Sequence, residues 1–249
     1  MFGMQDPSQT LLQIERYLEE GRLELAEVMA TQFSELMLAN KKREAQDRIF
    51  LLKGLRLMCD IALARGKAAQ NLSTIKRMHT ERKTLTALLR KHAPAMLDAM
   101  QPEHEDHLRA GRLYAAAGKH KAAAKAYAKC ESLVPGHLAA ALAAAQSSPS
   151  KATLQRLLTT LASAGPVIHA QGLFLLRPDG SPEVHADHVV ATLRQNSSMA
   201  AGFGERCEAE AQRLEAQKAA IIAGEQAANE QLQSALNALQ PKHDYYEYG

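Results

Sequence analysis

The chain contains no tryptophan, and aromatic residues make up only 4% of its 249 residues. A β-sandwich or a doubly wound sheet would need more aromatic and β-branched residues to fill its core. Apolar residues still make up 46% of the chain, and many of them are alanine, which buries little area but is the best helix former. This composition favours closely packed helices with thin cores, as in stacked helical repeats.

Long apolar runs are also absent. No stretch approaches 18 consecutive apolar residues, so we predict no membrane span. Residues 1–20 carry acids and no basic segment ahead of an apolar core, which argues against a secretory signal. The three cysteines, Cys59, Cys130 and Cys207, are an odd number and form no C-x-x-C pair. They are typical of buried or free thiols in a reducing compartment, so we predict a cytoplasmic protein.

Sequence signatures of catalysis are missing as well. The chain has no G-x-S-x-G, no P-loop, no G-x-G-x-x-G and no H-E-x-x-H motif. The stretch Gly202-Phe-Gly204 lacks the rest of any phosphate-binding motif. We therefore predict that the protein is not an enzyme and needs no cofactor.

Residues 104–137 carry the most informative motif. Seven residues there fall at regular positions: His107, Ala110, Gly111, Tyr114, Ala123, Tyr127 and Pro135. The repeat pattern W-x-x-L-G-x-x-Y…A-x-x-x-F…P has the same spacings, with His107 in place of Trp and Ala110 in place of Leu. The segment resembles one tetratricopeptide repeat (TPR), a helix–turn–helix unit of about 34 residues that packs against its neighbours.

The resemblance implies a structural role for each position. Gly111 and Ala123 are small and let two helices approach closely, while the two tyrosines fill the gap between the helices. Gly118 falls where a turn must join the helices. Pro135 ends the second helix, because proline lacks the N–H and clashes with the preceding turn. The family implies binding rather than catalysis.

Helical periodicity extends the array. Apolar residues recur at helical spacing and predict helices at about 8–20 and 22–39. The separations of the clear repeat recur there, at Tyr17, Gly21 and Ala26. We therefore predict an all-α fold, with a TPR-like array of antiparallel helix pairs (an α-solenoid) over residues 1–164.

Residues 165–204 form a variable connecting segment. Their turn signal at 178–180 combines proline with glycine. One interpretation is a helix that opens at 181–183, with proline in its first turn. The alternative is a small β-hairpin within 170–190.

Residues 205–240 predict a long C-terminal helix, because apolar residues there alternate three and four apart. Lys218 and Glu225 interrupt this seam, so the helix is expected to pack on the repeat domain or on a partner rather than form a self-sufficient coiled coil. Residues 241–249 form a Tyr-rich tail, which we predict to be flexible.

Charge is unevenly distributed along the chain. Residues 41–91 hold fourteen basic and four acidic side chains, whereas residues 1–40 and 205–249 are net acidic. The candidate basic patch consists of Lys41, Lys42, Arg43, Arg48, Arg56, Lys76, Arg77, Arg82 and Lys83. It could bind nucleic acid, pair with the acidic ends of the chain, or form a solvated face. Phe50 is the only aromatic residue in the block, which disfavours base stacking.

The first helix of a TPR lines a concave groove. The resemblance therefore places candidate partner-binding positions at Glu105, Arg109, Arg112 and Ala116. Two arginines about one turn apart suit a carboxylate, because guanidinium is a planar bidentate donor. An ordinary solvated helix face is the alternative. The Lys and Asn set of the family's acidic-tail clamp is missing, so that specificity is not carried over.

Two histidine pairs have the same pattern. His104 and His107, like His185 and His188, are spaced as H-x-D-H. Two imidazoles three apart on a helix can share a metal ion, with the Asp as third ligand. Ten histidines in a chain of this length produce such pairs by chance, so no metal site is predicted.

The sequence as a whole predicts a non-catalytic protein–protein interaction module. Such a module would be an adaptor, scaffold or chaperone of a larger assembly that holds a partner peptide or helix in the groove of its helical array. The alternative is a nucleic-acid-binding regulator that uses residues 41–91.

Overall fold

The computed structural model describes residues 6–97, 100, 102–164, 168–169, 173–176, 182–198 and 202–239. Most of these residues are helical, which confirms the prediction of an all-α fold. The chain divides into two compact units, 1–153 and 154–249, and each is described by itself. The division falls inside α8 (Lys151–Ala164), the last helix of the predicted repeat domain.

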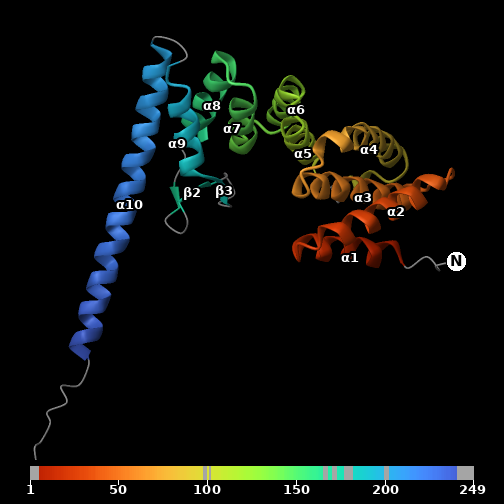
Figure 1. Cartoon of the computed structure of the whole chain (residues 1–249), viewed down its shortest axis with the longest axis horizontal. Coiled ribbons are helices and arrows are strands. Elements are labelled where there is room, and N and C mark those ends of the chain that lie inside the picture. Colours follow the sequence, from red (N-terminus) through yellow and green to blue (C-terminus); the bar gives the residue numbers. More distant parts are fainter. Residues whose placement is uncertain are drawn as a thin grey trace, which may run out of the picture. The chain divides into compact units, whose positions relative to one another are not determined.

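Antiparallel helix pairs build the first unit (Figure 1). Its helices are α1 (Pro7–Glu19), α2 (Leu23–Ala39), α3 (Ala45–Ala64), α4 (Leu72–His92), α5 (Glu103–Ala116), α6 (His120–Leu133) and α7 (Leu138–Ser147). The odd-numbered helices contact one another in succession, while α2 packs on α3 and α6 packs on α7. This is the order of a TPR-like stack, in which one helix of each pair contacts its counterpart in the next.

The turns inside the first three pairs share one geometry. Gly21, Gly66 and Gly118 all have φ near +70°, a conformation that glycine adopts without a Cβ clash. In each case the N–H of the next residue donates to a carbonyl five residues back, as in Arg22 to Tyr17 at 2.8 Å. This is the Schellman C-cap, and it repeats along the array. The spacing of Tyr17, Gly21 and Ala26 matches that of the clear repeat because the turns at Gly21 and Gly118 are equivalent.

Helix ends elsewhere also follow local chemistry. Asp6 caps α1, because its Oδ1 accepts a hydrogen bond from the Ser8 N–H at 3.0 Å, and Pro7 occupies the first turn. Helix α6 ends at Leu133, two residues before Pro135, as predicted. Short 3₁₀ turns at Ala68–Asn71 and Pro94–Met96 flank α4.

Close packing inside the α5–α6 pair depends on Gly111. A Cβ placed there would lie 2.3 Å from Cε1 of Tyr127. Tyr127 is only 2% exposed, so its ring fills the space that the glycine leaves. The predicted pairing of a small residue with a tyrosine between the two helices is confirmed.

Large aliphatic side chains form the core of the α1–α4 region. Residues that are almost fully buried there include Ile14, Leu51, Leu52, Leu55, Ile61, Ile75, Met78, Leu85 and Leu89. Burial of one such side chain contributes roughly 1.5–3 kcal/mol. Ala26 and Ala30 lie fully buried among them, where a larger side chain would separate the helices. A few large aliphatic residues and many alanines thus give the thin core that the composition indicated.

The second unit contains a small antiparallel sheet. In the described part of the chain its strands are ordered β1 (Ile168–His169), β2 (Phe174–Leu176) and β3 (Pro182–His185). Leu175 pairs with Ile168 on one side and with Val184 on the other. The hairpin interpretation is therefore confirmed, and the helix opening at 181–183 is wrong. The turn signal at 178–180 lies outside the described residues.

Helix α9 (Ala186–Gln195) begins after β3 because His185 caps it. The Nδ1 atom of His185 accepts a hydrogen bond from the Asp187 N–H at 3.2 Å. Sequence reasoning placed proline in the first helical turn, but the extended residues before His185 pair with β2 instead. Cross-strand pairing thus overrides the local signal.

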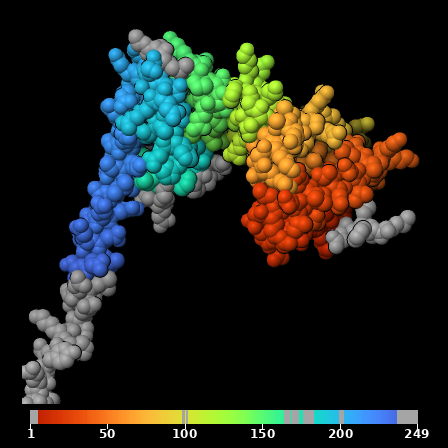
Figure 2. Space-filling view, viewed as in Figure 1, coloured from red at the N-terminus to blue at the C-terminus, as the bar shows by residue number. Residues whose placement is uncertain are grey.

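Helix α10 (Phe203–Leu239) follows the prediction of a long C-terminal helix. Its first turns pack on α9, where Cys207, Ala211 and Leu214 are buried. Lys218 pairs with Asp187 across the same contact. Residues 223–235 are all exposed, and this part of the helix stands clear of the rest of its unit (Figure 2). Among the described residues, no helix combines the length and apolarity that a bilayer crossing requires.

Candidate functional site: a basic groove beside a buried ionic network

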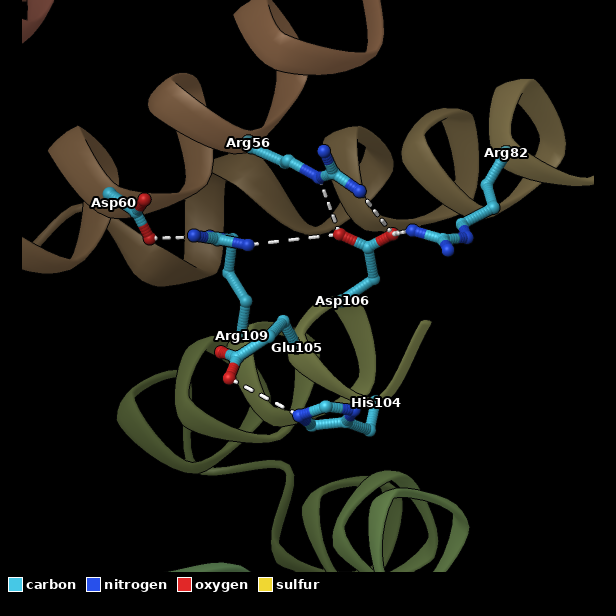
Figure 3. Close-up of polar contacts among 7 residues, drawn as sticks. All are labelled: Arg56, Asp60, Arg82, His104, Glu105, Asp106 and Arg109. Atoms are coloured by element: carbon cyan, nitrogen blue, oxygen red, sulfur yellow. Dashed lines mark hydrogen bonds and ion pairs between the residues drawn. The ribbon is translucent and has the colours of Figure 1, made fainter. Parts of the chain in front are cut away.

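A buried carboxylate joins three helices of the first unit (Figure 3). Asp106 of α5 is fully buried. Arg56 of α3 donates from Nε to its Oδ1 at 2.6 Å and from Nη2 to its Oδ2 at 2.9 Å. Arg82 of α4 donates from Nη1 to Oδ2 at 2.7 Å. The carboxylate therefore fixes the positions of α3 and α4 relative to α5.

A second carboxylate extends this network. Arg109 donates from Nε to Oδ1 of Asp60 on α3 at 2.7 Å, and its Nη1 lies 3.7 Å from Oδ1 of Asp106. Three guanidinium groups thus face two carboxylates. Buried charges need partners and hydrogen bonds to offset their desolvation, and each carboxylate here accepts at least one hydrogen bond from an arginine.

The protonation state of Asp106 follows from its surroundings. Burial by itself raises the pKa of this carboxyl group. The hydrogen bonds and charges of Arg56, followed by those of Arg82, outweigh burial, and the pKa lies below its usual value. Asp106 is therefore ionised at neutral pH.

A surface groove lies beside the network because α4 packs less extensively on α5 than α2 does on α3. The groove has a volume of about 490 Å³. Its lining residues are His79, Arg82, Lys83, Thr86, Ala87 and Arg90 of α4, Glu103 and His107 of α5, and Lys129 of α6. Lys83, Arg90 and Lys129 are exposed, so three cations lie around it. Glu103 is the one acidic residue among the lining residues that the structure describes.

Two histidines form part of the groove wall. The rings of His79 and His107 are stacked, with centroids 4.8 Å apart and planes inclined by 28°. Burial, and then the neighbouring His107, lower the pKa of His79. Burial also lowers the pKa of His107, although Glu103, whose Oε1 lies 3.5 Å from its Nε2, acts in the opposite direction. Both imidazoles are therefore neutral at pH 7.

The four predicted partner-binding residues lie apart from this groove. Arg109 is held by Asp60, as described above. Arg112 and Ala116 are exposed, and Glu105 is partly exposed beside His104. As the structure describes the groove, none of the four lines it. Their role as a partner surface stays a prediction.

Two of the nine residues of the predicted basic patch are buried. Arg56 and Arg82 are 6% and 9% exposed and belong to the ionic network, so their assignment to a surface patch is wrong. Both arginines are buried because they form ion pairs with the buried carboxylate of Asp106, which comes later in the sequence. The members that remain exposed are Lys41, Lys42, Lys76, Arg77 and Lys83.

Other basic side chains of residues 41–91 have partners within the chain. Arg43 donates to three carbonyl groups at the end of α2, among them that of Asn40 at 3.0 Å. Arg48 pairs with Glu81 at 2.6 Å. Lys67 pairs with Glu27 of the acidic N-terminal region at 3.0 Å. The alternative of internal pairing with an acidic end of the chain thus describes part of the block.

The predicted site residues did not include His79, Glu103 or Lys129 of the groove, whereas Arg90 fell within the basic block of residues 41–91. A signal was present for His79 and Arg90. On α4, His79, Lys83, Thr86 and Arg90 recur at intervals of four, three and four, which is one stripe of a helix. Lys129 carries no such signal, because only the approach of α6 to α4 makes it part of the groove.

The two H-x-D-H pairs do not act as units. His107 turns to His79, while His104 lies beside Glu105 and His137. In the second unit, the rings of His185 and His188 are 5.8 Å apart, and His185 caps α9.

Comparison with known proteins identifies the fold. No family model matches the chain, and no curated protein does. The chain is similar to a crystal structure from Podosopora anserina, of a protein assigned as a kinesin light chain with nearly identical TPR-like repeats. The TM-score is 0.57 and the sequence identity 17%, and the match covers 90% of this chain and 99% of the other. A point variant of the same protein gives a TM-score of 0.56 at 16% identity, over 90% and 100%. The chain has a TPR-like repeat fold.

Proposed function

We propose that this chain is a protein–protein interaction module that holds an acidic peptide segment of a partner in the basic groove beside α4, α5 and α6. The observation that carries the proposal is the set of three exposed cations, Lys83, Arg90 and Lys129, around one groove. The TPR-like fold supports it, because helical arrays of this kind offer extended binding surfaces.

The groove residues suit carboxylates of different geometry. Arg90 offers a planar fork that can bind one carboxylate through two parallel hydrogen bonds. Lys83 and Lys129 act as point charges that tolerate several orientations. Glu103 repels acidic groups at its own position and so helps to set the register of the peptide. The groove therefore favours a segment whose acids are spaced to avoid Glu103.

Affinity in such a groove depends on several contacts together. One exposed ion pair contributes roughly 0.2–1 kcal/mol, whereas a micromolar complex needs about 8 kcal/mol. The neutral His79 and His107 rings add a flat, partly apolar wall against which a peptide can pack. Three such pairs fall well short of that figure, so we expect weak affinity that decreases further with ionic strength, because exposed charges are screened by salt.

The buried network positions the groove in this proposal. Asp106 holds Arg82, and Lys83 and Arg90 project from the same helix. Their spacing is therefore set before a partner arrives, which reduces the entropy lost on binding. The mechanism is non-covalent, as expected for an adaptor, scaffold or chaperone.

The test uses fluorescence anisotropy with a labelled hexaglutamate peptide and the full chain. Charge reversal at Lys83, Arg90 and Lys129 together is expected to weaken binding at least about tenfold. The matched control reverses Lys76 and Arg77, two exposed cations of α4 outside the groove. Circular dichroism checks that both variants keep their helices. A loss of binding free energy per reversed charge that is equal in the two variants would show that only overall charge matters and would overturn the groove assignment.

Nucleic-acid binding by residues 41–91 remains the alternative function. Burial of Arg56 and Arg82 removes two of its nine proposed contacts. A gel shift with a single-stranded oligonucleotide at low and physiological salt tests it, since phosphate-driven binding falls steeply with salt. A shift that the Lys76 and Arg77 reversal abolishes, together with no hexaglutamate binding, would favour this alternative.

A further inference from the structure

Three side chains of types that bind metal ions lie together where α5 meets α7 in the first unit. His104 and Glu105 lie in the first turn of α5, and His137 is the residue at the start of α7. One ligand atom of each lies within 4.8 Å of the other two. From this cluster we infer that His104, Glu105 and His137 form a binding site for one Zn²⁺ ion.

One donor separation in the cluster already matches the separation that zinc requires. Zinc binds imidazole nitrogen and carboxylate oxygen at about 2.0–2.2 Å, so two ligands of a tetrahedral site are roughly 3.3–3.6 Å apart. His104 Nε2 and Glu105 Oε1 are 3.3 Å apart (Figure 3). The His104 and His137 rings meet edge to face with centroids 5.6 Å apart. The three donor atoms lie within 4.8 Å of one another, so side-chain displacements of roughly 1 Å would bring all three onto one ion.

The chemistry of the donors selects the ion. Two imidazoles and one carboxylate form a borderline-soft set that suits Zn²⁺ and other late first-row cations, and it is poor for Mg²⁺ or Ca²⁺, which prefer oxygen ligands. Three protein ligands leave one tetrahedral position for water or for a ligand atom of a partner. The side chain of Glu105 is 34% exposed, so that position opens toward solvent.

Location gives the ion a structural consequence. His137 belongs to the connection that follows α6, whereas His104 and Glu105 begin α5. A bound ion would join these two points directly, and α5 packs only briefly on α7 without it. Neighbouring residues of the same turn, Glu103 and His107, line the basic groove. Occupancy would therefore stiffen the α5 end of the groove, but the metal site does not depend on the groove having a partner.

The experiment uses the full chain, purified without a polyhistidine tag and stripped with a chelator. Titration with Co²⁺ is expected to give the visible d–d absorption of a tetrahedral site at one equivalent, and Zn²⁺ is expected to displace it. Because the ion binds the folded state, Zn²⁺ also raises the unfolding midpoint measured by circular dichroism. Absence of stoichiometric uptake by the stripped chain would overturn the proposal.

Variants distinguish this site from adventitious binding. His104→Ala and Glu105→Gln are each expected to weaken Zn²⁺ binding by at least about tenfold. Both side chains are partly exposed, so these variants should fold, and His137→Gln tests the buried ligand. The matched control, His185→Ala with His188→Ala, removes the other H-x-D-H pair and should bind as the wild type does. Undiminished binding by His104→Ala and Glu105→Gln, or loss in the control, would assign the metal elsewhere.

Discussion

Replacement of Asp106 by alanine tests the role of the buried network most directly. The change removes three charge-assisted hydrogen bonds and leaves Arg56 and Arg82 buried, with their main partner gone. Loss of one partner of a buried ion pair costs about 3–5 kcal/mol. Total stabilities of about 5–15 kcal/mol are usual, so a large share of the stability would be lost.

A second variant separates the contribution of the network to stability from the free-energy cost of leaving buried charges unpaired. Asp106→Leu combined with Arg56→Met and Arg82→Met removes all three charges and keeps the volume apolar. Apolar replacement of a buried ionic triad is often neutral or stabilising, and the Asp60–Arg109 pair stays complete in this variant. We therefore expect the triple variant to recover most of the stability that Asp106→Ala loses.

Amide hydrogen exchange followed by mass spectrometry is the suitable assay, because the chain has two compact units and a single unfolding transition is not assured. Asp106→Ala should speed exchange in α3, α4 and α5 by about two powers of ten or more, since 1.4 kcal/mol is tenfold. Helix α10 belongs to the other unit and serves as the internal control. Protection of α3–α5 within threefold of the wild type would refute the reasoning.

Two further predictions concern packing and thiol chemistry. Gly111→Ala should lower the free energy of unfolding of the first unit by about 1–3 kcal/mol in urea, because the new Cβ would overlap Tyr127. Gly224→Ala, in an open part of α10, is the control and should raise the free energy of unfolding by up to about 1 kcal/mol. Equal effects of the two changes would contradict the packing argument. Burial, and then Asp60, raise the pKa of Cys59 to about 12 from 9.0, so iodoacetamide at pH 8 should leave Cys59 unmodified in the folded chain and modify it in urea. Because the pKa is higher in the folded chain, the neutral thiol contributes its full stabilisation below about pH 9, and this contribution is lost as the pH rises toward 12. Rapid labelling of Cys59 in the folded chain would contradict the prediction.

Local patterns were sufficient for most of the fold. The spacing of Gly111 and Tyr127 predicted a close helix pair, and the structure places the tyrosine ring against the glycine. Gly21 and Gly118 predicted turns that proved to have the same Schellman geometry. These features succeed because they rest on contacts within one helix pair, where sequence separation is short and spacing alone fixes geometry.

The candidate site could be predicted only in part, because it depends on contacts between helix pairs. Arg56 and Asp106 are 50 residues apart, and nothing in the charge pattern of residues 41–91 indicates that this acid enters the block. The same holds for His137, which joins His104 only through the approach of α7 to α5. Side chains with long sequence separation meet through tertiary packing, which periodicity does not describe.

The position of the network explains why charged residues, rather than apolar ones, join α4 to α5. Helix α4 is long and contacts α5 over a short length, so an apolar contact there would bury little area and would fix its direction poorly. A bidentate arginine and a second arginine on one carboxylate allow few orientations, because their hydrogen bonds are directional. Asp106 holds Arg82 in place on α4, and Lys83 is the next residue on that helix. The hydrogen bond to Asp106 therefore also helps to fix the position of Lys83 at the groove. If the groove binds acidic peptides, the triple apolar variant should therefore keep most of its stability and lose affinity for hexaglutamate, because Lys83 is no longer positioned and Arg82, itself a lining residue, is replaced. Unchanged affinity would mean that the network serves the fold alone.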